Sequence, residues 1–422
     1  MLKDETQATL LQFPGLTTDQ CIKCNICNVA CPVMAVSGDF LGPKAVGPQA
    51  ERFRHPRLPI PDASVSLCSG CGTCSRVCPQ GVAIAEMNTQ AKARLVAQHG
   101  APLRDQLLAR PQMLGQWMRP FAGVANRLLK SNIVRWSLDR SFGIHQDAPL
   151  PPFSGKTFRS GVAQRCMDAP PEDLGEDTWV AYFHGCSTNH YEPRIGELAI
   201  AVLEKLGCRV IVPPQVCCGL PLQSNGLFKA ARRYAEKNTQ LLRPFIEKGI
   251  PIVGTSSSCT LQLKHETRSV LGLNGRDCEE LALGTRDIFE WIVESLWETV
   301  LKMDLAPVQA LVLYHAPCQL KSHWMGTPAL QVLRLIPGLN LQVSQAECCG
   351  IAGTYGVKSE KYAIARDVGQ NLFHQVEDVQ PDWVVTDSET CRWWIEQHTG
   401  VTSIHPIEIL ASAMNLTPLE GI

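Results

Sequence analysis

Short apolar runs of strand length alternate with amphipathic stretches of helical length through the C-terminal half of the chain, and the whole series occurs twice. Each series opens with an apolar run that ends at a cysteine, continues through a helical stretch and a second short run, and closes with a third run at another cysteine. The order strand, helix, strand, helix, strand predicts two α/β units built around parallel sheets. The matching segments are 178–186 and 310–318, 194–207 and 328–338, 208–212 and 339–343, and 250–259 and 382–391.

Four cysteines recur in register in the two series, with 131 or 132 residues between each pair of counterparts. Because open α/β sheets bind ligands beyond the carboxyl ends of their strands, we expect these thiols to gather there. They are Cys186, Cys217, Cys218 and Cys259 in the first unit, and Cys318, Cys348, Cys349 and Cys391 in the second.

Two of these cysteines are adjacent in each unit and are followed by glycine, in the stretches "QVCCGLPLQSNG" (215–226) and "AECCGIAGTYG" (346–356). Thiolates on consecutive residues could hold two irons of one cluster, or bridge them. The glycine permits a close backbone approach and a positive φ. The alternative is a pair of ordinary buried cysteines, which are common singly. A fourfold match in register argues against that alternative.

A second cysteine pattern occupies the N-terminal part of the chain. "CIKCNICNVACP" and "CSGCGTCSRVCP" both have the spacing C-x2-C-x2-C-x3-C-P. In bacterial ferredoxins the first three thiolates of such a run hold one [4Fe-4S] cluster, and the fourth reaches the neighbouring cluster. The pattern therefore predicts two [4Fe-4S] sites. One takes Cys21, Cys24, Cys27 and Cys78, and the other takes Cys68, Cys71, Cys74 and Cys31.

Zinc is the alternative metal for these runs, since C-x2-C also suits zinc. A zinc site needs four ligands and has no use for a third evenly spaced cysteine followed by C-P. The 36 residues between Cys31 and Cys68 make the region longer than a compact ferredoxin. By analogy, this length favours the helical ferredoxin-type module of respiratory iron–sulfur subunits.

The middle of the chain carries an apolar stripe at helical spacing within 112–130, interrupted by Pro120 and flanked by basic residues. Proline should kink or divide this helix. The stripe could pack on the protein or on another subunit, or it could lie on an anionic membrane surface. Its residues are Leu114, Trp117, Met118, Phe121, Val124 and Leu128.

These patterns predict an α+β multidomain chain with four parts. They are a two-cluster ferredoxin-type domain at 15–87, a helical connector at 88–177, and the two cysteine-rich units at 178–300 and 308–415.

Composition limits the class of protein further. The chain has 422 residues, 45% of them hydrophobic, and a net charge of −1, so nothing favours a nucleic-acid partner. Its first residues lack the features of a secretory signal, and no apolar run approaches 18 residues. We therefore expect a cytoplasmic protein, and peripheral attachment to the inner face of the cell membrane stays open at this point. In that compartment its 19 cysteines favour metal ligation over disulfides.

The cysteine-rich units resemble the CCG domain, found in heterodisulfide reductase, in the glycolate oxidase iron–sulfur subunit and in lactate-utilisation proteins. Two ferredoxin runs followed by two such units are most similar to the family of C subunits of anaerobic glycerol-3-phosphate dehydrogenases. The resemblance covers nearly all of residues 20–412 and is weakest between 90 and 175. It is carried by "CIKCNICNVACPV", "GPKAVGPQAERFR", "CCGLPLQSNG", "TSSSCT", "CCGIAGTYG" and "VVTDSETCRWWIE".

This resemblance implies an iron–sulfur electron-transfer subunit of a flavin-dependent dehydrogenase complex. Such a subunit passes electrons from sn-glycerol 3-phosphate oxidation on a partner flavoprotein to menaquinone or a membrane reductase. It would hold two [4Fe-4S] clusters in the ferredoxin-type domain and one or two further clusters in the CCG units. The alternatives are a glycolate or lactate dehydrogenase subunit, or a thiol–disulfide enzyme similar to heterodisulfide reductase.

One departure from the family pattern bears on these alternatives. The full CCG pattern ends in C-x2-C, whereas here Ser256 precedes Cys259 and Ser388 precedes Cys391. Each unit therefore keeps four thiolates, enough for an ordinary [4Fe-4S] cluster. We expect electron transfer rather than disulfide chemistry.

The chain shows no dinucleotide or nucleotide-phosphate loop, so substrate oxidation is expected on another subunit. Histidines close to the CCG cysteines are expected to be hydrogen-bonded neighbours of the clusters. Three cysteines outside the repeats are interpreted as ordinary thiols, with Cys208 packed in its sheet. The histidines are His184, His190, His315 and His323, and the other two cysteines are Cys166 and Cys278.

Overall fold

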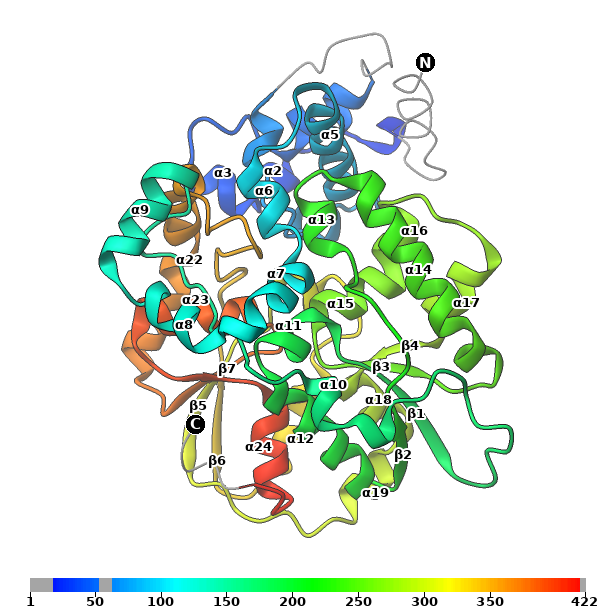
Figure 1. Ribbon diagram of the computed structural model, residues 1–422. Coiled ribbons are helices and arrows are strands. Elements are labelled where there is room, and N and C mark those ends of the chain that lie inside the picture. Colours follow the sequence, from blue (N-terminus) through cyan, green and yellow to red (C-terminus); the bar gives the residue numbers. More distant parts are fainter. Residues whose placement is uncertain (1–17, 53–62, 418–422) are drawn as a thin grey trace.

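The computed structural model describes residues 18–52 and 63–417 (Figure 1). Two four-stranded parallel sheets form its centre, with the equivalent strand orders β2-β1-β3-β4 and β6-β5-β7-β8. The first sheet consists of β1 (Thr178–Phe183), β2 (Cys208–Ile211), β3 (Ile252–Gly254) and β4 (Thr285–Asp287). The second consists of β5 (Ala310–Tyr314), β6 (Leu339–Val343), β7 (Trp383–Val385) and β8 (Ser403–Ile404).

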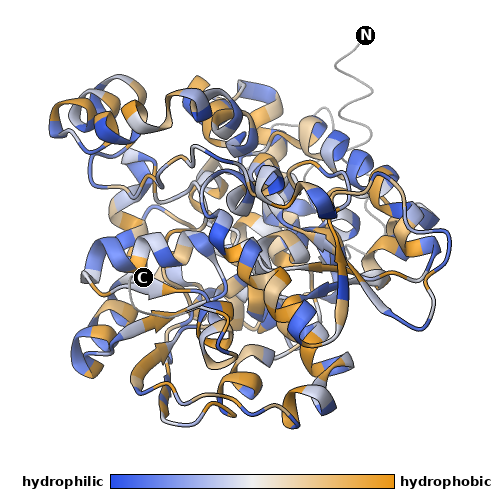
Figure 2. Ribbon diagram, turned by 60° about the horizontal axis from the view of Figure 1, so that its bottom comes forward, coloured by the Kyte–Doolittle hydropathy of each residue, from blue (hydrophilic) through white to orange (hydrophobic). Residues whose placement is uncertain are grey.

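The expected α/β units are confirmed, and each has one strand more than the sequence pattern predicts. The fourth strands, β4 and β8, are only three and two residues long. Strands this short leave almost no apolar run to detect. Most residues of β1 and β5 are buried and all three residues of β3 are, which explains their nearly continuous apolar sequences. Figure 2 shows hydrophobic residues along these strands and on the helix faces that cover them.

The two units pack on each other through matching helices. In each unit, the second helix after the first strand contacts the helix that directly follows the fourth strand of the other unit. A single hydrophobic core runs through this contact, from Leu203 in the first unit to Leu410 in the second. The pairs are α12 (Pro193–Lys205) with α24 (Pro406–Ala413), and α21 (Pro328–Leu333) with α18 (Ile288–Ser295).

The N-terminal module is helical and lies at the end of the molecule toward which both cysteine-rich units point their loops (Figure 1). Its α3 packs against α22 of the second unit, and its α5 packs against α13 of the first. The module therefore contacts both units. The bounds are α2 (Ile26–Val29), α3 (Pro32–Val36), α4 (Thr73–Arg76), α5 (Ile84–His99), α13 (Leu220–Ser224) and α22 (Ser359–Val379).

The connector forms four short helices that lie across the two units. Pro120 divides the predicted helix as expected, because α7 ends at Met118 and a 3-10 turn covers Arg119–Phe121. Its N-terminal helix is fixed to the second unit, where Arg104 forms an ion pair with Glu360 at 2.8 Å. The helices are α6 (Leu103–Leu108), α7 (Pro111–Met118), α8 (Ala122–Leu129) and α9 (Asn132–Phe142).

The apolar stripe of the connector does not belong to the protein's own core. Trp117, Phe121 and Val124 are 62%, 64% and 65% exposed, so packing on this chain does not account for them. Leu114 and Met118 turn inward and are partly buried. No helix in the described residues combines the length and hydrophobicity needed to cross a membrane.

Candidate metal centres and the cavity between them

The first set of ferredoxin-type cysteines lines a small cavity near the surface of the module. Cys21, Cys24, Cys27 and Cys78 all contribute to its wall. These are three thiols of the first run and the last thiol of the second. Cys24 is exposed, whereas Cys27 is buried at the start of α2. Burial raises the pKa of Cys27, and the charges of Cys21 and Cys24 add to this rise.

The second set lies deeper, between the module and the second cysteine-rich unit. Burial raises the pKa of Cys31 to about 12, and the thiolates of Cys71 and Cys68 contribute to the rise. The pKa of Cys74 is raised well above its usual range by burial and by the charges of the other three. The pKa of Cys71 is raised as well, also chiefly by burial. Clustered thiols of this kind are a fitting ligand set for a cationic iron–sulfur core, which would offset the repulsion between their thiolates.

The first cysteine-rich unit brings its four thiols to the carboxyl edge of its sheet. Cys186 lies in α11 (Gly185–His190), the adjacent pair precedes α13, and Cys259 lies in α15 (Ser257–Leu261). The Sγ atoms of Cys186 and Cys217 are 3.7 Å apart. Hydrogen bonds with Cys186 and Cys218 hold the pKa of Cys217 well below its usual range. All four thiols of the unit are buried.

The second unit repeats this arrangement. Its thiols lie in α20 (Cys318–Lys321), in the loop before α22 and in α23 (Glu389–Thr399). Hydrogen bonds from Cys318 and Cys349 hold the pKa of Cys348 well below its usual range. The Sγ atoms of Cys349 and Cys391 are 3.0 Å apart. The pKa is therefore lowered at the same position of each adjacent pair.

His315 differs from the other histidines near the cysteines. A ring nitrogen of His315 and the Sγ atoms of Cys349 and Cys391 all lie within 4.8 Å of one another. The ring is buried, and neither of its nitrogens has a hydrogen-bond partner in the described part of the chain. Burial lowers its pKa to about 4, which keeps the imidazole neutral. An unpartnered neutral imidazole beside thiols is a suitable donor to a metal or to its sulfur ligands.

The remaining histidines have ordinary partners. His184 Nδ1 lies 2.5 Å from the Gly185 carbonyl oxygen, and His323 Nε2 lies 2.9 Å from the Ser257 carbonyl oxygen. His190 Nε2 lies 3.2 Å from Asn189 Nδ2. Cys208, which lies outside the clusters, is buried in its sheet as predicted.

The glycine after each cysteine pair has the conformation that the sequence predicts. Gly219 and Gly350 have φ values of +92° and +100°. A Cβ atom on Gly350 would lie 1.9 Å from the carbonyl oxygen of Ala365, whereas one on Gly219 would lie 3.3 Å from that of Ala231. The loop of the second unit therefore approaches its following helix more closely than any side chain allows.

The second ferredoxin-type set adjoins the second cysteine-rich unit. Burial raises the pKa of Cys71, and the charge that adds most to this rise is that of Cys348. An ion pair of 2.9 Å between Arg76 and Glu347 fixes the same contact. The Tyr355 hydroxyl of the second unit also donates a hydrogen bond of 2.9 Å to the Leu67 carbonyl oxygen of the module. The deeper set of the module is thus held against the thiols of the second unit.

The serines that replace the fifth cysteine of each unit have different surroundings. The Ser256 hydroxyl donates a hydrogen bond of 3.1 Å to the Glu389 carboxylate, which also accepts one of 3.0 Å from Ser187. The hydroxyls of Ser388 and Thr390 lie 3.3 Å apart. Glu389, which the sequence interpretation missed, therefore bridges the two units. The only sign of this role in the sequence is that the second unit has a glutamate at the position where the first unit has a serine.

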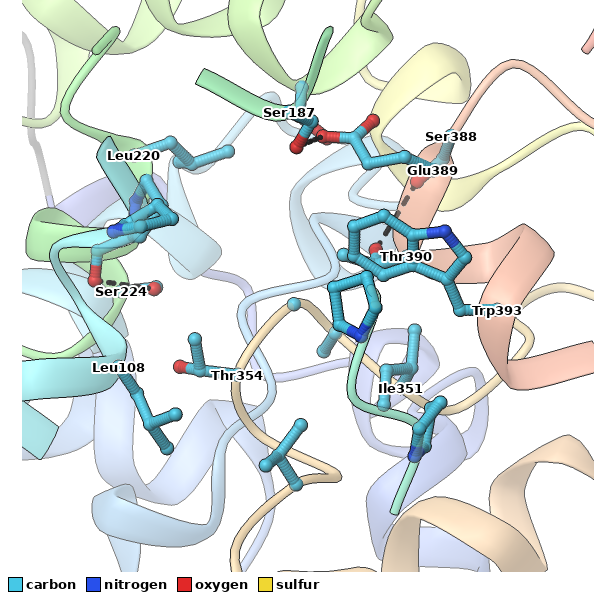
Figure 3. Close-up of a pocket in the computed structure, with 18 of the residues that line it drawn as sticks. Leu108, Ser187, Leu220, Ser224, Ile351, Thr354, Ser388, Glu389, Thr390 and Trp393 are labelled. Carbon is cyan, nitrogen blue, oxygen red and sulfur yellow. Dashed lines mark hydrogen bonds between the residues drawn. The ribbon is translucent and has the colours of Figure 1, made fainter. Parts of the chain in front are cut away.

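A cavity of about 570 Å³ lies between the module, the connector and the two cysteine-rich units. Figure 3 shows side chains of Ser187, Leu220, Thr354 and Trp393 around its open centre. Thiols from three of the four cysteine sets reach its wall, so these three sets share one cavity. They are Cys68, Cys71, Cys186, Cys218, Cys259, Cys318, Cys349 and Cys391.

Comparison with known families matches both cysteine patterns. Residues 17–82 match the 4Fe-4S dicluster domain, and residues 180–264 and 312–396 each match the cysteine-rich domain. These matches support iron–sulfur clusters in the chain. All 19 cysteines lie in the described residues and are free thiols there.

Curated relatives extend over the same regions. The C subunit of the anaerobic glycerol-3-phosphate dehydrogenase of Escherichia coli is 36% identical over 94% of this chain and 98% of its own length. The B subunit of the fumarate reductase (CoM/CoB) of Methanothermobacter marburgensis is 24% identical over 92% of this chain and 70% of its own. The D-2-hydroxyglutarate dehydrogenase of Pseudomonas putida is 24% identical over 81% of this chain and 33% of its own.

Proposed function

The chain belongs to the family of C subunits of anaerobic glycerol-3-phosphate dehydrogenases, and we propose that it delivers electrons from sn-glycerol 3-phosphate oxidation on a partner flavoprotein to a membrane quinone. It is an iron–sulfur electron-transfer subunit of a flavin-dependent complex. The observation that carries the proposal is the sequence of thiol sets from the exposed Cys24 to the shared cavity.

Four thiol sets are the proposed ligand groups. When bound, an iron–sulfur cluster accepts and releases single electrons, which a two-electron flavin on the partner can supply. The ferredoxin-type sets are Cys21, Cys24, Cys27 and Cys78, and Cys31, Cys68, Cys71 and Cys74. The sets of the cysteine-rich units are Cys186, Cys217, Cys218 and Cys259, and Cys318, Cys348, Cys349 and Cys391.

The first set is the proposed contact point of the flavoprotein. Cys24 is exposed, and apolar side chains around it are exposed as well, with Ile22 at 61% and Val29 at 85%. Exposed apolar groups beside a redox ligand suit a protein partner, since docking would bury them and shorten the distance to the flavin. The deeper set lies behind this surface, against Cys348.

The connector is the proposed membrane contact. Its exposed apolar side chains share short helices with exposed basic ones, including Arg119 and Arg127. Aromatic and aliphatic groups can enter the acyl boundary of a bilayer while basic groups attract anionic lipid. This arrangement would hold the subunit peripherally on the membrane without a spanning helix.

Disulfide chemistry is not favoured by the surroundings of the two serines. Ser256 is hydrogen-bonded to Glu389, and Ser388 lies beside Thr390, so neither position offers a fifth thiolate. The shared cavity instead adjoins the connector, where the lipid phase would be.

The first experiment is an iron and sulfide count on anaerobically purified protein, followed by reduction through the partner flavoprotein. Each [4Fe-4S] cluster brings four irons, so four loaded sets give about 16 irons per chain. We expect sn-glycerol 3-phosphate to bleach the visible iron–sulfur absorbance only when the flavoprotein is present. About 8 irons per chain, unchanged in a Cys348→Ser variant, would contradict the assignment of clusters to the cysteine-rich units.

A further inference from the structure

We propose that the 570 Å³ cavity between the connector and the cysteine-rich units binds the isoprenoid quinone that accepts the electrons. The proposal rests on the proposed function and adds a location to it. The proposed clusters on the eight wall thiols would take the part of this volume next to those thiols, and the quinone would take the remainder. Most of the wall of that remainder is apolar, as is typical of small-molecule sites.

The outer part of the cavity is made by the connector. Its inward apolar residues come from three helices that also carry the proposed membrane contact. Carbon-rich walls of this kind suit an isoprenoid chain and a quinone ring, whose burial is favourable by about 25 cal/mol per Å². The connector residues of the wall are Leu114, Met118, Ala125, Leu128, Leu129, Val134 and Leu138.

Leu128 marks the entrance. It lines the cavity, yet it is 51% exposed on α8, next to the basic residue Arg127. Val124, one helical turn earlier, is 65% exposed. The cavity therefore reaches the surface on the face that we place against the lipid. A quinone dissolved in the bilayer could enter here without crossing water.

The inner part of the cavity is polar and adjoins the thiols. Gln319 and Thr390 line it and could donate hydrogen bonds to the two carbonyl oxygens of a quinone ring, while the Ser258 hydroxyl donates to Gln319 Oε1. Trp393 lines the same region, and its Nε1–H is already engaged by Glu192 at 2.7 Å, so its ring is held in place. A fixed indole face beside polar donors is suited to stacking on a flat ring.

The electrons and protons of the proposed quinone reduction balance with those that the complex and the solvent supply. Oxidation of one sn-glycerol 3-phosphate on the partner releases two electrons. One quinone takes up these two electrons and two protons from the aqueous phase, and becomes the quinol. Two carboxyl groups line the cavity, Glu266 and Glu389. Burial raises the pKa of Glu266 to about 7, so this group can hold a proton at neutral pH.

The test is direct binding of a short-chain menaquinone to the cluster-loaded protein in detergent, measured by quenching of tryptophan fluorescence. A Leu138→Trp variant fills the cavity wall, and we expect it to weaken binding at least tenfold. The control is Ser137→Trp, the adjacent and exposed position on α9, which should bind as the wild type does. Equal binding by both variants would overturn the proposal.

A second measurement covers the case in which Leu138→Trp does not fold. A photoactivatable quinone is crosslinked to the wild-type protein and the labelled peptides are identified by mass spectrometry. We expect labels on wall residues of α7, α8 and α9 and around Thr390 and Trp393, suppressed by excess menaquinone. Labels on segments outside the cavity wall, or labels not suppressed, would indicate partition into the detergent and refute the site. If clusters are still reduced by sn-glycerol 3-phosphate in that case, the relay stands and only the quinone site fails.

Discussion

The Ser256 hydroxyl of the first cysteine-rich unit donates a hydrogen bond of 3.1 Å to the Glu389 carboxylate of the second. Ser256 occupies the position where the CCG pattern has a fifth cysteine. Here that position joins the two units instead of adding a thiolate. Because Glu389 also accepts a hydrogen bond from Ser187, a single carboxylate ties two segments of the first unit to the wall of the cavity.

A Ser256→Ala variant should weaken this junction. It removes a hydrogen bond to a charged, buried group, so we expect the free energy of unfolding to fall by about 2 kcal/mol. Thermal unfolding of the anaerobic, cluster-loaded protein measures the change. Ser137→Ala, at an exposed position, is the control and should leave the midpoint unchanged. An equal midpoint for both variants would show that the bond contributes nothing.

The two glycines after the cysteine pairs should respond differently to alanine. In Gly350→Ala, the new Cβ would lie 1.9 Å from the Ala365 carbonyl oxygen, so the loop must leave α22, at a cost on the order of 4 kcal/mol. Gly219→Ala meets its nearest atom at 3.3 Å and should lose only the strain of a positive φ, about 1 to 2 kcal/mol. Iron content per chain and thermal midpoint are the measurements. Equal losses in the two variants would contradict this difference.

Much of this arrangement could be predicted from the sequence, because strands and thiols leave periodic traces. Both sheets, the helix break at Pro120 and the positive φ of Gly350 follow from local patterns. The fourth strands could not be found, since β8 covers only Ser403–Ile404. The Glu389 bridge could not be found either, because it joins residues 133 positions apart through tertiary packing.

The connector illustrates a different limit of sequence interpretation. Its apolar stripe is evident in the sequence, but periodicity cannot tell whether a stripe faces a core, a partner or a membrane. The structure leaves Trp117 and Phe121 more than half exposed, while Leu114 turns inward to the cavity. Residues of one helix therefore face both the outer surface and the cavity, and a single hydrophobic pattern does not distinguish these two faces.

Membrane attachment should depend on these exposed aromatic side chains. Trp117→Glu and Phe121→Glu each remove an apolar group and add a negative charge, so vesicle binding should fall roughly tenfold or more per substitution. Cosedimentation with vesicles rich in anionic phosphatidylglycerol measures it. The control is Leu283→Glu on α17 (Arg276–Gly284), where the leucine is 69% exposed outside the connector. If all three variants bind equally, the connector is not the contact.

A buried carboxyl at the end of β7 should make stability depend on pH. Asp387 is 2% exposed, and its carboxylate accepts a hydrogen bond of 2.5 Å from the Tyr314 hydroxyl. Burial raises its pKa to about 6, although the bond from Tyr314 and the charge of Arg392 oppose the rise. Burial and the charge of Asp387 also raise the pKa of Asp287. The site therefore disfavours the ionised carboxylate.

The sign of the effect follows from this raised pKa. In the unfolded chain the carboxyl has a pKa of about 3.9, so its contribution to stability is complete below that pH and is lost as the pH rises through about 6. Asp387→Asn keeps an oxygen for Tyr314 without the charge. We expect it to raise the free energy of unfolding by about 3 kcal/mol near pH 8, and by about half as much near pH 5. Urea unfolding at both pH values measures this difference, with the exposed Asp367→Asn as control. A gain that is the same at both pH values would show that Asp387 does not titrate between them.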